Sequence, residues 1–208
     1  MIEVHTANTP NGKKITIMLE EIGFEYKIIK VNINKNQQFD PKFEKISPFR
    51  KIPVIIDKKN NISLFESGAI LIYLGELSGK FYEKKRRTLI NQWLMGQMAY
   101  VGPMLGQHHQ FHHYNPGKSK FGEERYFKIA ERIYYELDRR LSFSKYLADN
   151  DYSIADIATF PWIARHEWHD IGLKKFKNLL RWYNLITERP AVKKGYDLLN
   201  KGEEIPSA

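Results

Sequence analysis

The chain changes its secondary-structure pattern once, after about eighty residues, and this change restricts the fold more than any other feature. Before it, strand-like and helix-like segments alternate, beginning with strand patterns at 2–4 and 26–28 around a helix pattern at 15–22. After it, only helical periodicities occur. We therefore expect an α/β domain over residues 1–80 and an all-helical domain over residues 86–202.

Turn and cap residues predict the remaining elements. The Asp-Pro pair at 40–41 is typical of a helix cap followed by a first-turn proline. Residues 52–57 and 62–65 predict a β-hairpin, and residues 67–79 predict a helix that a glycine ends. The sequence YSIAD at 152–156 predicts a capping box at the start of a later helix.

Composition excludes several classes of protein. The 208 residues include no cysteine, so any sulfur chemistry must come from a ligand. The net charge of +9 is spread along the chain without a nucleic-acid-binding motif, which indicates a solvated surface with some attraction for anionic small ligands. No apolar run approaches the roughly 20 residues of a membrane span, and the N-terminus lacks a signal pattern. We expect a cytoplasmic protein that binds neither membrane nor nucleic acid.

Four separated motifs carry a family resemblance: TPNG at 9–12, KIPVI at 51–55, FESGAI at 65–70 and YSIADIATFPW at 152–162. In this order they resemble a cytosolic glutathione transferase, which implies a thioredoxin-like domain followed by a helical domain. The residues of these motifs are most similar to those of the bacterial nu-class group of glutathione-dependent disulfide-bond oxidoreductases. That group is akin to the yeast nitrogen-regulation prion protein. The resemblance also implies a homodimer.

Glu66 and Ser67 stand at a predicted helix start, where backbone N–H groups and the helix dipole favour a bound carboxylate. The resemblance assigns Glu66 to the ammonium group and Ser67 to the carboxylate of the γ-glutamyl end of glutathione. An ordinary capped helix is the alternative.

The resemblance places the rest of glutathione along Ile52. It implies a cis bond between Ile52 and Pro53, which leaves the backbone of Ile52 to pair with the cysteinyl part like an added strand. A trans proline in an edge strand is the alternative. Gln38 and Lys51 on the flanking loops are implied to meet the glycyl carboxylate, although Lys51 also fits a solvated surface charge.

The thiol of a ligand bound in this way would fall near the TPNG turn. A thiol with a pKa of about 8.5 is mostly protonated at neutral pH, so nearby donors and a helix N-terminus raise the thiolate fraction. We therefore expect Asn11 first, and Thr9 second, to activate the ligand's own sulfur. Both residues also suit helix capping and turn formation.

The helical domain offers three further candidates. The resemblance assigns Arg125 to the carboxylate of a second glutathionyl unit, with a surface salt bridge to a neighbouring glutamate as the alternative.

The segment QHHQFHH at 107–113 contains histidine pairs four residues apart, a spacing that can ligate zinc. Because no Cys or HExxH accompanies them, we expect no metal. We interpret the segment as the wall of a second-substrate pocket, with Gln107 and Phe111 as pocket residues.

Together these residues predict a glutathione-dependent disulfide-bond oxidoreductase, with hydroperoxide reduction as a side activity. The expected cosubstrate is glutathione, reduced or as its disulfide, and the partner is a small disulfide or electrophile. The TPNG turn lacks the Tyr, Ser or Cys of the commoner transferases, so it favours a site for two glutathione sulfurs or one disulfide. Conjugation of glutathione to electrophiles and a non-catalytic glutathione-binding regulatory module are the alternatives.

Overall fold

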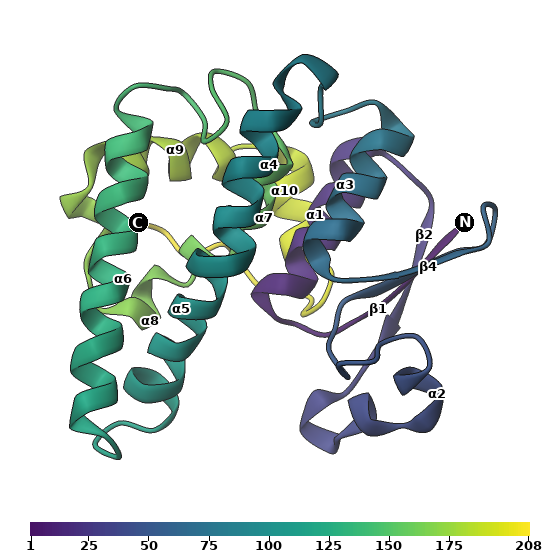
Figure 1. The fold of residues 1–208 in the computed structure, drawn as a ribbon, viewed down its shortest axis with the longest axis horizontal. Helices are drawn as coiled ribbons and strands as arrows, with labels where there is room; N and C mark the ends of the chain where they lie inside the picture. The colour runs from purple at the N-terminus through teal and green to yellow at the C-terminus, as the bar shows by residue number, and fades with distance from the viewer. The chain divides into compact units, whose positions relative to one another are not determined.

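A computed structural model describes residues 1–208. Contacts divide the chain into two compact units, one of Met1–Tyr82 with Arg189–Glu204 and one of Glu83–Glu188 with Ile205–Ala208. The first unit is α/β and the second is helical (Figure 1). Residues 189–204 thus belong to the first unit, whereas the helical domain expected from the sequence runs to residue 202; the domain boundaries themselves stay a prediction.

The first unit contains a four-stranded sheet in the order β2-β1-β3-β4. Strand β1 (Ile2–Thr6) is parallel to β2 (Tyr26–Lys30), and helix α1 (Pro10–Ile22) connects them. Strand β3 (Val54–Asp57) is antiparallel to β1 and to β4 (Ile62–Phe65). The predicted βαβ unit and hairpin are therefore confirmed, and together they form the thioredoxin-like sheet.

Helix α1 is the centre of this unit, because it packs against both α3 (Ser67–Ser78) and α10 (Pro190–Asp197) (Figure 1). Its contact with α10 is so close that a Cβ atom at Gly195 would lie 2.6 Å from Cα of Ile17. Helix α2 (Pro41–Glu44) follows the 3₁₀ turns η1 (Ile33–Lys35) and η2 (Gln37–Phe39). A small apolar cluster holds α2, in which Phe43 packs with Val31 and Val54.

The second unit consists of helices alone. Their bounds are η3 (Lys84–Arg86), α4 (Arg87–Gly96), α5 (Gly102–His108), α6 (Lys120–Leu141), α7 (Ile154–Ile163), α8 (His166–His169), η6 (Leu173–Lys175) and α9 (Lys177–Thr187), with π-helical segments η4 (Gln97–Val101) and η5 (His109–Tyr114). The turn before Pro103 widens into η4, because proline offers no N–H and crowds the preceding turn. None of the helices in the structure is both long and apolar enough to cross a membrane.

The predicted capping box at α7 is confirmed. The side chain of Asp156 is completely buried and accepts hydrogen bonds from the backbone of Ser153 at 3.0 Å and of Leu147 at 2.9 Å. It also accepts from the Ser153 hydroxyl and from Nε1 of Trp182. One carboxylate therefore fixes the start of α7 inside the core of the helical unit.

Candidate active site

The TPNG turn joins β1 to α1. Thr9 caps the helix, since its hydroxyl accepts a hydrogen bond from the backbone N–H of Gly12 at 3.1 Å. A Cβ atom at Gly12 would lie 2.2 Å from the carbonyl oxygen of Ala7, so this position requires glycine. The close turn leaves Thr9 and Asn11 half-buried at the start of the helix. The capping role of Thr9 is confirmed, and the catalytic roles of both residues stay predictions.

The segment after α10 holds this turn from both ends. Lys13 Nζ donates to Oε1 of Glu203 at 2.6 Å, and the Asn8 side-chain amide donates to Oε2 of the same carboxylate at 2.7 Å. Lys13 also donates to the carbonyl oxygen of Tyr196. Sequence reasoning missed this clamp, because no local pattern connects residue 203 to the first helix.

The cis bond between Ile52 and Pro53 is confirmed. Ser47, which is almost fully buried, pins the loop before it: its hydroxyl donates to the carbonyl oxygen of Lys51 at 2.7 Å and accepts from the Lys51 N–H at 3.0 Å. The backbone of Ile52 makes no hydrogen bond within the chain, as a strand-like partner for a peptide ligand requires. The Lys51 side chain is exposed and lies outside any ion pair.

Helix α3 begins at Ser67 without a side-chain cap. The preceding Glu66 has φ 68° and ψ 112°, a conformation that is uncommon for a residue with a side chain. Its carboxylate is exposed, while Ser67 is only 3% exposed. Helix α3 therefore begins without the side-chain cap of an ordinary capped helix, and the roles of Glu66 and Ser67 toward glutathione stay predictions.

Lys14 contacts the predicted site residue Ser67, and sequence reasoning overlooked it. Its Nζ atom donates to Oγ of Ser67 at 3.3 Å, although the lysine is 1% exposed. Burial lowers the pKa of Lys14 to about 7, against the opposing effect of the Glu66 charge. The available signal in the sequence was a second lysine in the otherwise buried face of α1.

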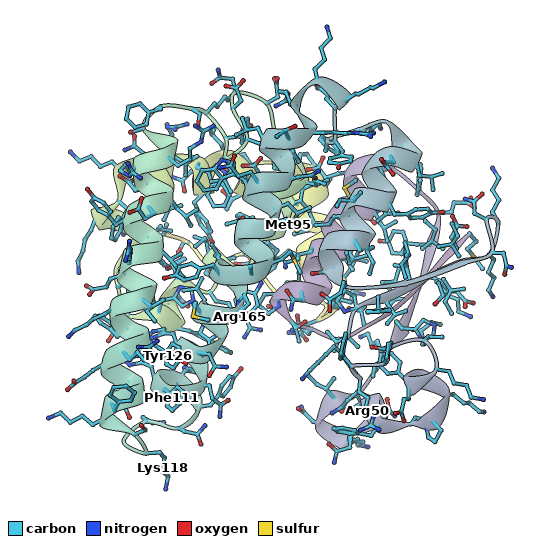
Figure 2. The ribbon with its side chains drawn as sticks, viewed as in Figure 1. Arg50, Met95, Phe111, Lys118, Tyr126 and Arg165 are labelled. Carbon is cyan, nitrogen blue, oxygen red and sulfur yellow. The ribbon has the colours of Figure 1, made fainter.

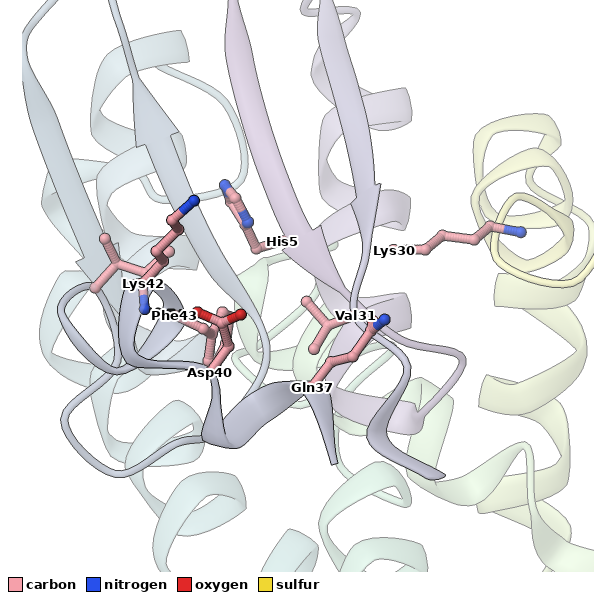
Figure 3. A pocket seen from close by; sticks show the side chains of 8 residues that line it. His5, Lys30, Val31, Gln37, Asp40, Lys42 and Phe43 are labelled. Carbon is pink, nitrogen blue, oxygen red and sulfur yellow. Dashed lines mark hydrogen bonds between the residues drawn. The ribbon is translucent and has the colours of Figure 1, made fainter. Parts of the chain in front are cut away.

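Gln38 lies on η2, with its side-chain oxygen shielded from solvent and without a hydrogen-bond partner. The same region borders a cavity of about 260 Å³ (Figure 3). The cavity is lined by His5, Lys30, Val31, Gln37, Asp40, Lys42, Phe43 and Ile46. None of the predicted glutathione-binding residues lines the cavity, although Ile52 packs against the cluster of Val31 and Phe43 that does.

The remaining candidates lie in the helical unit. Phe111 stacks on Tyr126 with ring centroids 5.3 Å apart (Figure 2), and a Cβ atom at Gly122 would clash with the Phe111 ring. Arg125 is exposed, with its guanidinium 6.0 Å from the centroid of the Tyr126 ring, and it forms no salt bridge with a neighbouring glutamate. Gln107 is exposed on α5. Phe111 and Arg125 therefore share Tyr126 as a neighbour.

The histidine-rich segment packs as aromatic rings. His109 stacks on His169 with centroids 4.8 Å apart and on Trp162 at 6.0 Å. His108 stacks on His112, and its Nε2 lies 3.0 Å from the carbonyl oxygen of His169. No group of three or more His, Asp or Glu side chains is placed to hold a metal ion.

Comparison with known proteins agrees with an α/β unit followed by a helical unit. Residues 3–76 match the N-terminal domain of glutathione S-transferase, and residues 105–190 match its C-terminal domain. The chain belongs to the glutathione S-transferase family. It is 43% identical over 198 residues to the disulfide-bond oxidoreductase YfcG of Escherichia coli, an alignment that covers 92% of each chain.

Solved structures of related transferases hold glutathione. A glutathione transferase from Burkholderia graminis, with two glutathione molecules bound per subunit, is 36% identical with a TM-score of 0.91 and covers 97% of this chain and 89% of its own. One from Pseudomonas putida, with one glutathione disulfide per subunit, is 38% identical with a TM-score of 0.87 over 97% and 92% of the two chains.

Proposed function

We propose that this protein is a glutathione-dependent disulfide-bond oxidoreductase that uses the thiol of bound glutathione. One observation carries the proposal: the turn at the start of α1 presents Thr9 and Asn11, while the whole chain contains no thiol. The nucleophilic sulfur must then belong to the ligand. The similarity to proteins named disulfide-bond oxidoreductases supports this choice of reaction.

The reaction takes place in two exchanges. The thiolate of one glutathione attacks a disulfide, forms a mixed disulfide and releases the first thiolate. A second glutathione thiolate attacks the glutathionyl sulfur, which gives glutathione disulfide and releases the second thiolate. Asn11 and the helix start stabilise the attacking thiolate, and Ile52, Glu66 and Ser67 hold its peptide.

Further parts of the proposal extend from the same site. Hydroperoxide reduction would consume two glutathione molecules and yield an alcohol, water and glutathione disulfide. A reduced glutathione pool is a cytoplasmic condition, so the proposal includes that location. Homodimer formation and the roles of Gln38, Lys51 and Arg125 remain predictions from the family resemblance. The pocket roles of Gln107 and Phe111 remain predictions from the sequence of their segment.

A side-by-side assay with reduced glutathione tests the proposal. One preparation is given a small dialkyl disulfide, a hydroperoxide and an aryl halide, and glutathione binding is measured by calorimetry. We expect catalysed disulfide reduction, while S-methylglutathione, whose sulfur is blocked, should bind without supporting turnover. Conjugation alone would indicate a transferase, and binding without turnover of any substrate would indicate a regulatory module.

A further inference from the structure

The position of Lys14 on α1 requires an explanation. A lysine that is 1% exposed loses nearly all hydration of its ammonium group, and such a charge is retained in a protein only where other groups compensate it. Its Nζ donates to the hydroxyl of Ser67, the first residue of α3. An ammonium group can only donate, so the Ser67 hydroxyl proton points away from Lys14.

Two residues of the predicted γ-glutamyl subsite, Glu66 and Ser67, lie beside Lys14. Glu66, next to Ser67, is the charged group that acts on Lys14. Farther along α1, Glu20 pairs with Lys194 and Glu21 with Arg189. Glu203 pairs with Lys13.

We infer that Lys14 is a positioning residue of the γ-glutamyl subsite, which orients the Ser67 hydroxyl and supplies the positive charge that balances the α-carboxylate of bound glutathione. This inference rests on the proposed function. A carboxylate at Ser67 would complete a sequence of alternating charges, with Glu66 facing the ligand's ammonium group and Lys14 behind the ligand's carboxylate. The start of α3 adds its dipole to the same end of the ligand.

The test compares glutathione with 4-aminobutyryl-cysteinylglycine, which lacks only the α-carboxylate. We expect the wild type to prefer glutathione by roughly 10- to 100-fold in Kd, since bonds to a charged group are lost in the analogue. Lys14→Met should reduce this preference roughly tenfold. Lys27→Met, which removes an exposed lysine on β2, should keep it. An undiminished preference in folded Lys14→Met overturns the inference.

The wild type provides a second measurement that requires no variant. Because burial gives Lys14 a pKa of about 7, its ammonium group loses its proton near neutral pH when no carboxylate is bound. The preference for glutathione should therefore fall by roughly threefold between about pH 5.5 and about pH 7.5. A constant or rising preference overturns the inference, even if Lys14→Met does not fold. Failure of the wild type to bind glutathione at all would instead remove the proposed function.

Discussion

The ammonium group of Lys13 lies 2.6 Å from the carboxylate of Glu203 and ties the segment after α10 to the first helix. The lysine side chain is 2% exposed and that of the glutamate 25%. Because Asn8 binds the other oxygen of Glu203, one carboxylate holds residues on both sides of Thr9 and Asn11. The geometry of the candidate active site thus depends on the last residues of the first unit.

Glu203→Gln should lower the free energy of unfolding by about 1–3 kcal/mol, because it leaves a buried lysine without its carboxylate. Burial acts to raise the pKa of Glu203, but Lys13 and Asn8 hold it below its ordinary value. The pair's contribution is therefore complete above the ordinary glutamate pKa and is lost as pH falls through the lower folded value. Urea unfolding measures both effects. Glu204→Gln, at an exposed neighbour, is the control. Equal losses of unfolding free energy in the two variants would contradict the stabilising role of the contacts that Glu203 makes with Lys13 and Asn8.

Ser67→Ala should weaken glutathione binding by about 1–3 kcal/mol, the cost of removing a donor to a charged group. Calorimetry on the folded variant measures the change. Ser63→Ala, at an exposed position of β4, should bind like the wild type. Unchanged affinity in Ser67→Ala would exclude the γ-glutamyl pocket.

Asn11→Ala should leave glutathione affinity nearly intact but slow disulfide reduction at neutral pH by roughly one to two decades, as expected from about 1–3 kcal/mol of lost thiolate stabilisation. Higher pH should restore part of the rate, because alkali regenerates the thiolate. Single-turnover rates across pH, beside a melting curve, provide the measurement. If the rate of Asn11→Ala depends on pH as the wild-type rate does, while its melting temperature is lower, Asn11 only supports the helix start.

The stability of the helical unit should fall in acid. Burial, reinforced by Arg165, lowers the pKa of His109 to about 3. The folded state therefore disfavours a proton that the unfolded chain accepts below about pH 6.5, and stability is lost progressively from there toward about pH 3. His109→Phe keeps a ring against Trp162 and should reduce this slope by about 1.4 kcal/mol per pH unit. Urea unfolding at several pH values provides the slope, and a wild-type slope in folded His109→Phe would contradict this prediction.

Asp156→Ala should lower the free energy of unfolding by about 3–5 kcal/mol, because it leaves buried donors of Leu147, Ser153 and Trp182 without their acceptor. Chemical denaturation measures the loss. Asp151→Ala removes an exposed carboxylate in a 3.5 Å surface pair with Arg86 and should cost less than about 1 kcal/mol. Similar losses in both variants would argue against the buried network.

The sequence alone determined the features that depend on neighbouring residues. The alternation of β1, α1 and β2 follows from short-range hydrophobic periodicity, and the caps at Thr9 and Ser153 follow from side chains that bond within the first helical turn. The cis bond before Pro53 was predicted from a family motif rather than from hydrophobic periodicity. The motifs were also sufficient to define the family and to propose glutathione as cosubstrate.

Only the tertiary structure decided which distant residues meet. Lys14 and Ser67 are 53 residues apart and Lys13 and Glu203 are 190 apart, so their contacts depend on how α1 packs with α3 and α10. From residue type alone, a lysine on a helix is expected at the surface, and the histidine segment is interpreted as the wall of a second-substrate pocket. Packing instead buries Lys13 and Lys14 in the first unit and stacks His109 between aromatic rings in the second. Burial and partner choice are properties of the assembled core, because each is set by atoms that the local sequence does not contain.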